Sequence, residues 1–360
     1  MARQLTLAYP GELDTLTGGY IYDKRILAEL QTLGWLTETL SLDARFPAVD
    51  EATKALSAQR LANVDRARLL IIDGLALGAL GTHTQTIRAA RPFIALVHHP
   101  LALESGIDPQ TAAALHASEQ QALALAESVI VTSAVTKHTL AAQYGVAAEI
   151  ITVIEPGVDR PPEHEIAAAR ASGAGQTIRL LSVGSLVHRK GFDVLIRALG
   201  QLQDLDWTLT IVGDTERSPP CMALVTELIK QFGLQERINM TGALPGEVLA
   251  RQYAQADLFV LASRYEGYGM AYTEALAWGL PVVGTDGGAA LETLATPAAR
   301  IVAAEDPTTL ATTLGELITH ANTRQQMQQA AREHARSLPT WQASGKQFER
   351  ALSSQAPSCQ

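Results

Sequence analysis

SRYEGYGMAYTEALAWGLPVVGTDGG, residues 263–288, is the part of the chain that decides the fold. The short apolar run ADLFVLAS leads into it, a second run, GLPVVGT, lies near its end, and the helical segment AYTEALAW separates the two. Short continuous apolar runs are typical of strands that are buried on both faces of a parallel sheet. The stretch therefore predicts a strand, a helix and a second strand of the same sheet.

Two carboxylates in this stretch, Glu266 and Glu274, bracket a Gly-x-Gly turn that leads into the helix. Gly267 and Gly269 have no side chains, so the backbone can approach a ligand closely, and the amides that open a helix favour phosphate. Glu274 lies one helical turn from Met270, where its carboxylate needs hydroxyl or amide donors such as a ribose diol. Glu266 would then bind a sugar hydroxyl at the other end of a diphosphate. The alternative is a solvated pair of glutamates.

The same alternation of apolar runs and helical segments extends through the chain, as in βα units. Strands are predicted in the N-terminal half at residues 4–9, 36–41, 68–73, 93–98, 128–132 and 149–154. A second series consists of IRLLSVG, LTIVGD, RINMTG, DLFVLAS, PVVGTD and ARIVA, and residues 306–337 that follow it are predicted to be helical. Between the two series, EPGVDRPPEHE and ASGAGQ predict an interdomain linker. We predict an α/β protein of two doubly wound, Rossmann-like domains, residues 1–165 and 166–340, each with its ligands at the carboxyl ends of the strands.

Length and composition agree with two globular domains, because 360 residues exceed the usual size of one hydrophobic core. The net charge of −9 argues against nucleic acid or an anionic membrane as the main partner. Cys221 and Cys359 are too few for a disulfide framework, and Cys359 belongs to a polar tail. The N-terminus has no secretory apolar segment and no run is long enough to span a membrane, so a cytoplasmic protein without integral membrane association is expected.

A basic pair, Arg189 and Lys190, lies near a helix start in the phrase VGSLVHRKGFDVLIRAL, which opens the second domain. The order of residues is not that of a P-loop. Two cations at this place can face a diphosphate as charges and hydrogen-bond donors. The alternative is a solvated basic turn.

The first domain offers two short motifs. Gly18 and Gly19 lie between the first strand and the first helix, where a lone Gly-Gly pair is also compatible with a simple tight turn. His98 and His99 end the strand FIALV. Adjacent histidines point to opposite sides of a strand, which disfavours a metal site made by the pair alone, and one of them is equally compatible with a structural role.

The spacing of Glu266 and Glu274 resembles the E-x7-E signature of the GT4 family of retaining glycosyltransferases. The resemblance extends over nearly the whole chain and implies the GT-B fold, in which two Rossmann-like domains face each other across a cleft. It implies that the C-terminal helix, residues 341–355, crosses back to the first domain; a helix that only caps the second domain is the alternative. It also implies that Glu266 contacts the donor sugar and Glu274 the nucleotide ribose.

Other segments resemble the family in order and spacing. Gly184 and Lys190 match the pattern G-R-L-x3-K-G, Ser185 stands where the family often has arginine, and Arg189 is the candidate for the missing charge. His98 matches the histidine that contacts the donor sugar, although His99 would take this role if the strand ended one residue earlier. The resemblance thus implies catalytic roles for His98, Glu266, Lys190 and Arg189. It implies donor-binding roles for Gly18, Gly19, His99, Gly184, Ser185, Ala243, Leu244, Gly267, Tyr268, Gly269, Met270 and Glu274.

The activity implied is transfer of a sugar from a nucleotide-sugar donor to an acceptor hydroxyl with retention of configuration. Lys190, Arg189 and the helix amides would stabilise the departing phosphate, so neither a metal nor another cofactor is expected. A soluble small molecule is the expected acceptor, because the best membrane-binding segment, ATKALSAQRLANVDRAR, carries diluted charge and no Trp or Phe. The alternatives are a lipid-linked or polysaccharide acceptor at a membrane surface, a phosphorylase-like or epimerase relative, and a nucleotide-sugar-binding protein without turnover.

Overall fold

The computed structural model describes residues 3–162, 164, 166 and 177–353. The chain forms two compact units, Met1–Gly157 with Pro339–Gln360, and Val158–Leu338. The sequence predicts domain boundaries after residues 165 and 340. The predicted linker run at residues 171–176 and the polar tail with Cys359 lie outside the described residues.

The N-terminal unit is built on a sheet of parallel strands in the order β2-β1-β3-β4-β5-β6. The strands are β1 (Gln4–Pro10), β2 (Leu36–Leu42), β3 (Leu69–Asp73), β4 (Ile94–Val97), β5 (Ser128–Val131) and β6 (Ile151–Val153). Every residue of β4 and β5 is buried, which explains their continuous apolar sequences. The six predicted N-terminal strands are confirmed.

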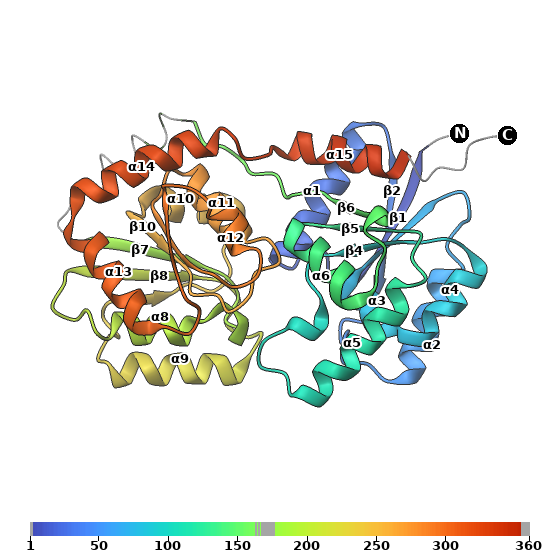
Figure 1. Ribbon diagram of the computed structural model, residues 1–360, viewed down its shortest axis with the longest axis horizontal. Helices are drawn as coiled ribbons and strands as arrows, with labels where there is room; N and C mark the ends of the chain where they lie inside the picture. Colours follow the sequence, from blue (N-terminus) through green and yellow to red (C-terminus); the bar gives the residue numbers. More distant parts are fainter. Residues whose placement is uncertain (1–2, 163, 165, 167–176, 354–360) are drawn as a thin grey trace. The chain divides into compact units, whose positions relative to one another are not determined.

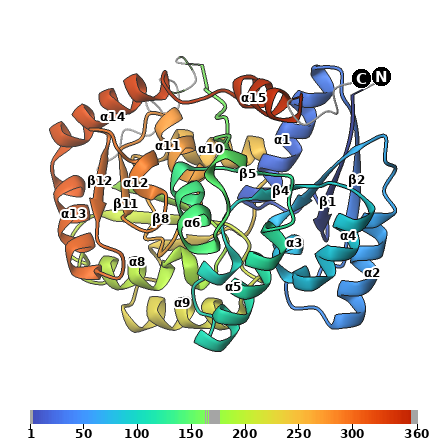
Figure 2. The same ribbon diagram turned by 45° about the vertical axis from the view of Figure 1, so that its right-hand side comes forward.

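Helices cover both faces of this sheet. They are α1 (Gly18–Thr32), α2 (Glu51–Ala62), α3 (Gly74–Leu80), α4 (Thr84–Ala90), α5 (Pro109–Leu123), α6 (Ala134–Tyr144) and α15 (Trp341–Ser353). Figures 1 and 2 show α1 and α15 side by side on one face, and α2, α3, α4 and α5 on the other. The C-terminal helix α15 therefore belongs to the N-terminal unit.

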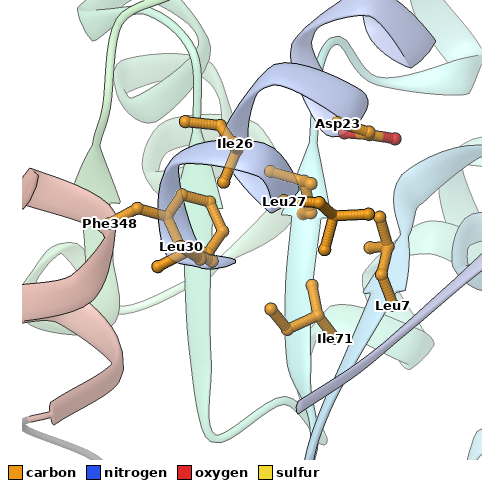
Figure 3. A pocket seen from close by; sticks show the side chains of 8 residues that line it. Leu7, Asp23, Ile26, Leu27, Leu30, Ile71 and Phe348 are labelled. Atoms are coloured by element: carbon orange, nitrogen blue, oxygen red, sulfur yellow. The ribbon is translucent and has the colours of Figure 1, made fainter. Parts of the chain in front are cut away.

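Helix α15 is held against α1 by close apolar packing. Figure 3 shows Phe348 of α15 beside Leu30 of α1, in a small pocket that is apolar except for Asp23. A Cβ atom added to Gly345 would lie 2.4 Å from the Cβ atom of Glu29, so the two helices approach too closely for a larger residue there. The predicted C-terminal helix thus buries its apolar side on α1.

The C-terminal unit repeats the plan with strand order β12-β11-β10-β7-β8-β9, again all parallel. The strands are β7 (Ile178–Val183), β8 (Trp207–Val212), β9 (Ile238–Met240), β10 (Leu258–Val260), β11 (Val282–Thr285) and β12 (Ala299–Val302). The helices are α8 (Phe192–Leu199), α9 (Pro219–Gln231), α10 (Gly246–Gln255), α11 (Met270–Ala277), α12 (Ala290–Thr293), α13 (Pro307–Thr319) and α14 (Ala321–Ala335). Figure 1 shows α8 and α9 on one face of the sheet and α10 and α11 on the other. The predicted α/β fold of two doubly wound domains is confirmed.

The stretch that is predicted to be helical contains one break. Residues 306–337 form two helices, α13 and α14, that meet at His320, whose φ of −104° and ψ of 89° are not helical. The backbone N–H of His320 donates to the carbonyl of Glu316, and its ring Nδ1 lies 2.9 Å from the same oxygen. This side chain therefore closes α13 locally, a contact that the apolar periodicity of the segment does not predict.

Candidate active site

The C-terminal unit has a topological switch point between β7 and β10. These strands are neighbours in the sheet, but the chain leaves β7 toward β8 on one side and leaves β10 toward β11 on the other. Loops at the carboxyl ends of two such strands diverge and create a place where ligands bind in open α/β sheets. The loop after β7 ends in the short 3-10 helix η4 (His188–Lys190), and the loop after β10 contains Glu266.

Lys190 and Glu266 meet at this switch point as an ion pair. Lys190 Nζ lies 2.6 Å from Glu266 Oε1, and Arg189 Nη1 lies 3.6 Å from Glu266 Oε2. The hydroxyl of Ser263 donates to Glu266 Oε1 at 2.5 Å. Burial alone would raise the pKa of Glu266, but the positive charges of Lys190 and Arg189 outweigh it and hold that pKa below its ordinary value. Three of the predicted catalytic residues thus lie together, with Glu266 ionised.

The two loops are fixed to each other by Arg264. Its guanidinium donates two hydrogen bonds of 2.8 Å to the carboxylate of Asp193 on α8, and a third, of 2.7 Å, to the carbonyl of His188. Its backbone N–H donates to the carbonyl of Arg189. The hydrogen bonds to Asp193 raise the pKa of Arg264 further above its already high value. Arg264 therefore fixes the position of the turn that carries Arg189 and Lys190.

Glycines make room for this arrangement. Gly269 has a φ of +97°, a conformation that other residues rarely adopt, and directly precedes α11. A Cβ atom at Gly184 would lie 3.2 Å from the Cδ and Cε atoms of Lys190, so Gly184 leaves space for the lysine side chain. Ser185 forms the turn that follows, where its carbonyl accepts from the N–H of Val187 at 2.8 Å.

Glu274, on α11, is partly exposed and accepts a hydrogen bond of 2.8 Å from the hydroxyl of Tyr253 to its Oε2. Burial of its carboxyl raises the pKa of Glu274 to about 7. The hydrogen bond from Tyr253 and the charge of Lys190 oppose this rise, while the negative charge of Asp159 adds to it. The second glutamate of the motif is therefore placed in a site where its charge state changes near neutral pH.

The remaining donor-binding candidates of this unit are distributed around the same edge. Gly267 and Tyr268 lie between Glu266 and α11, Met270 is the first residue of α11, and the side chain of Tyr268 is buried. Ala243 and Leu244 follow β9 at the far side of the sheet, with Ala243 exposed and Leu244 packed against the core. All of these segments follow the carboxyl ends of their strands.

In the N-terminal unit, His98 contacts two buried carboxylates. Its Nε2 atom lies 3.1 Å from Asp23 Oδ1 and 3.5 Å from Asp73 Oδ2. Asp73 ends β3, Asp23 lies on α1 after β1, and His98 follows β4, so the cluster lies at the carboxyl edge beside the β1–β3 switch point. The ring of Tyr22 packs edge-on against the imidazole at 5.4 Å.

The charges of this cluster shift each other's pKa values. Burial acts to lower the pKa of His98, but the nearby Asp23 and Asp73 carboxylates outweigh it and raise that pKa. Burial, reinforced by the charge of Asp23, raises the pKa of Asp73 to about 7. The cluster thus favours a protonated imidazole held between acidic side chains.

The other predicted residues of this unit lie around His98. A Cβ atom at Gly19 would lie 3.1 Å from the imidazole Cδ2 atom of His98, so this glycine gives the ring space. Gly18 is the first residue of α1, whose N-terminus is capped by the Thr17 hydroxyl. His99 does not join the cluster, because its Nε2 atom lies 3.3 Å from Glu104 Oε2. The two adjacent histidines therefore have different partners.

Asp23, Asp73 and His98 also form a possible metal site. Each offers one ligand atom, and these atoms lie within 4.8 Å of one another. Two carboxylates and one imidazole are a donor set that divalent cations such as Zn²⁺ or Mn²⁺ accept. The same atoms are equally explained by the hydrogen bond and ion pairs given above, in which the imidazolium supplies the positive charge.

Comparison with known proteins identifies both halves of the chain. The model of Glycosyltransferase Family 4 matches residues 51–160, and the model of Glycosyl transferases group 1 matches residues 167–334. The chain belongs to the GT4-type glycosyltransferases. The predicted family is therefore confirmed, and its GT-B fold agrees with the two parallel sheets described above.

Two curated relatives and one solved structure illustrate the range of this glycosyltransferase family. GDP-mannose-dependent alpha-(1-6)-phosphatidylinositol monomannoside mannosyltransferase of Mycolicibacterium smegmatis is 30% identical over 63% of this chain and 62% of its own length. D-inositol 3-phosphate glycosyltransferase 1 of Catenulispora acidiphila is 30% identical over 64% of this chain and 58% of its own length. The matched stretches thus span about three fifths of these relatives. Sucrose-phosphate synthase of Thermosynechococcus elongatus has the same fold, with a TM-score of 0.82 and 19% identity over 98% of this chain and 99% of that one.

The GT4 motifs do not include several residues that the structure adds to the site. Asp23 and Asp73 surround His98, Arg264 holds the basic turn, and Tyr253 contacts Glu274. A signal was present for Asp73, which ends a predicted strand next to the one that ends in His98. Within the described part of the chain, every helix is too short or too polar to cross a bilayer.

Proposed function

We propose that the protein is a retaining glycosyltransferase that moves a sugar from a nucleotide-sugar donor to an acceptor hydroxyl. The observation that carries the proposal is the position of Lys190, Arg189, Glu266 and Glu274 together around the β7–β10 switch point. Two cations, an ionised carboxylate and the start of α11 suit a diphosphate with a sugar on one side and a ribose on the other. A solvated basic turn is disfavoured, because Lys190 and Arg189 are mostly buried against Glu266.

Each group has a role that follows from its chemistry. Lys190 and Arg189 attract the diphosphate, and the amides at the start of α11 donate to its oxygens. Glu266, held ionised, accepts hydrogen bonds from hydroxyls of the donor sugar, and Glu274 accepts them from the ribose. As the glycosidic bond breaks, negative charge grows on the departing phosphate, where the two cations stabilise it.

We propose that the anomeric configuration of the sugar is retained, because the chain belongs to this family. The proposal does not require a nucleophile from the protein. The acceptor hydroxyl attacks from the side that the phosphate leaves, and the departing phosphate oxygen takes the acceptor's proton. Glu266 is already engaged by Lys190, Arg189 and Ser263, which supports a role in binding rather than as a covalent nucleophile. We further propose that no metal is needed, since Lys190 and Arg189 supply positive charge at the leaving group.

A soluble small molecule is the proposed acceptor. The relative named for D-inositol 3-phosphate supports this class, and so does the segment predicted to be the best membrane-binding candidate, residues 52–68. Only its first part is helical, since α2 ends at Ala62. Lys54 pairs with Glu51 at 2.7 Å, and Arg68 pairs with Glu38, so two of its positive charges are neutralised within the protein.

A lipid-linked acceptor is the second candidate. It is favoured by the relative whose name gives phosphatidylinositol monomannoside as its substrate. The two acceptor classes require different surfaces, because a lipid-linked acceptor must be reached at a membrane. Membrane binding is therefore the measurement that distinguishes the two acceptor classes.

The test of the activity is a panel of UDP-, GDP- and ADP-sugars screened by thermal shift, followed by detection of released nucleoside diphosphate. We expect one donor to stabilise the protein and to be hydrolysed slowly or transferred when metabolite extracts supply an acceptor. Glu266→Gln is the matched variant, because it keeps the shape of the side chain and removes its charge. Stabilisation by a donor with no release of diphosphate in any extract would contradict the enzyme and favour a binding protein.

A further inference from the structure

We propose that Tyr253 is a positioning residue that orients Glu274 toward the ribose and thereby sets a preference for ribonucleotides over deoxyribonucleotides. This inference rests on the proposed function, because it assigns the ligand of Glu274 to the nucleotide. It adds a residue on α10 that none of the sequence motifs contains. The Tyr253 hydroxyl donates a hydrogen bond of 2.8 Å to Glu274 Oε2.

The ring of Tyr253 has no freedom to move away from Glu274. The side chain is 2% exposed and stacks on Phe259 of β10, with ring centroids 6.0 Å apart and an angle of 26° between the planes. Phe259 in turn packs edge-on against Tyr272 at 6.0 Å. Three aromatic rings from α10, β10 and α11 therefore fix the direction in which the hydroxyl points.

A fixed donor on one oxygen of a carboxylate sets the direction of the other. Because Tyr253 donates to Oε2, the plane of the Glu274 carboxylate is set by a buried group, and Oε1 becomes the acceptor available to a ligand hydroxyl. Vicinal ribose hydroxyls are donors of the right kind. Replacing the phenol hydroxyl with hydrogen removes this constraint without altering the aromatic packing.

The same hydrogen bond favours the charged form of Glu274. The pKa of Glu274 is raised to about 7, because the rise caused by burial, to which the charge of Asp159 adds, exceeds the lowering by the Tyr253 hydrogen bond and the charge of Lys190. Burial raises the pKa of Tyr253 well above its ordinary value, with the charge of Glu274 adding to the rise, so the phenol remains a donor throughout the neutral range. Loss of the Tyr253 hydroxyl moves the pKa of Glu274 upward, and a larger fraction of the carboxyl is then protonated and weaker as an acceptor at pH 7.

The experiment compares ribose with deoxyribose directly. Binding of UDP, GDP and ADP and of their 2′-deoxy and 3′-deoxy forms is measured by calorimetry between pH 6 and 9 for the parent and Tyr253→Phe. The ratio of ribo to deoxy affinity is used, because ionisation of the diphosphate is common to both ligands and cancels. Tyr144→Phe is the control, since it removes a similar hydrogen bond, from Tyr144 to Glu119 at 3.2 Å, in the N-terminal unit.

We expect the parent and Tyr144→Phe to prefer the ribonucleotide by roughly tenfold or more above pH 8, as for a hydrogen bond to a charged group. At each pH this preference should be smaller in Tyr253→Phe than in the parent, falling to within about threefold at pH 7, and it should recover in part as the pH rises. In a Glu274→Ala background, Tyr253→Phe should change the ratio no further, because the group that it positions is absent.

Two results would overturn the inference while leaving the proposed function intact. One is an unchanged ratio in Tyr253→Phe at every pH; the other is an equal loss of ribo and deoxy affinity at every pH, which is what general loosening of the fold produces. A parent that binds the nucleotides without any ribo preference would instead overturn the ribose role of Glu274, and the inference with it. A variant that no longer folds would show that the hydroxyl is structural, which also contradicts a positioning role.

Discussion

Lys190 and Glu266 form a largely buried ion pair, with Nζ 2.6 Å from Oε1 and side chains only 14% and 5% exposed. A lysine whose only role was to bind a ligand would be expected to have an exposed side chain. Here the cation proposed to bind the donor phosphate also neutralises the carboxylate proposed to bind the donor sugar. Binding and folding are therefore coupled at this pair, and a phosphate that approaches Lys190 shares it with Glu266.

The first prediction concerns this coupling. Lys190→Met should abolish most turnover and should also destabilise the protein by about 3 kcal/mol, because it leaves a buried carboxylate with Arg189 as its remaining cation. Lys190→Met combined with Glu266→Gln should recover much of the stability but none of the activity. Urea unfolding of the two single variants and the double variant measures this. Additive losses of stability would show that the pair is not coupled in the folded protein.

The pH dependence of the same pair has a defined sign. The pKa of Glu266 is lowered in the folded protein, so its contribution to stability is complete above the ordinary glutamate pKa and is lost as the pH falls through the lower folded value. In Lys190→Met the folded pKa rises toward or above the ordinary value. The acid unfolding midpoint of this variant should therefore lie at higher pH than that of the parent, whereas the double variant should lack this shift.

The second prediction concerns metals. Turnover should survive EDTA, since Lys190 and Arg189 are the groups proposed to supply positive charge at the leaving group. Activity before and after chelation, together with elemental analysis of the purified protein, decides it. Complete loss of activity that Mg²⁺ or Mn²⁺ restores would contradict the prediction. Asp73→Asn is the informative variant, because it should abolish restoration if the metal occupies the Asp23, Asp73 and His98 cluster.

The third prediction concerns His98. Asp23→Asn should lower the pKa of His98, because it removes the negative charge 3.1 Å from Nε2, and NMR titration of the imidazole measures the shift. Turnover of this variant should begin to fall at a lower pH than that of the parent, because the imidazole loses its proton at a lower pH. His99 serves as the internal control, since its partner is Glu104 and its titration should not change. An unaltered His98 pKa would mean that Asp23 does not hold the charged imidazole.

Much of this architecture could be predicted because burial on both faces of a parallel sheet leaves a continuous apolar run in the sequence. Strands such as Ile94–Val97 have such an apolar run, and both sheets could be predicted from these runs. The Glu266 and Glu274 motif could be predicted as well, because its glycines and carboxylates lie close together in the chain. Both kinds of signal are local.

The partners of these residues were not predictable in the same way. Asp23 on α1 meets His98 after β4, and Tyr253 on α10 meets Glu274 on α11, only after elements that are separate in the sequence pack together. A buried aspartate on an amphipathic helix looks like an ordinary polar residue until its neighbours are known. The break at His320 depends on a side chain that bonds its own helix end, which apolar periodicity does not record.

The last prediction separates the two acceptor classes by membrane binding. Cosedimentation with phosphatidylglycerol-containing vesicles at low salt should leave the protein in the supernatant, as should neutral phosphatidylcholine vesicles. The net charge of −9 opposes adsorption, and α2 presents Arg60 and Leu56 at its surface but no aromatic side chain to insert. Lys54→Gln with Arg60→Gln is the matched variant, which should behave like the parent. Strong binding of the parent to anionic vesicles that fades as salt rises, and that this variant loses, would place the acceptor at a membrane and replace the soluble acceptor with a lipid-linked one.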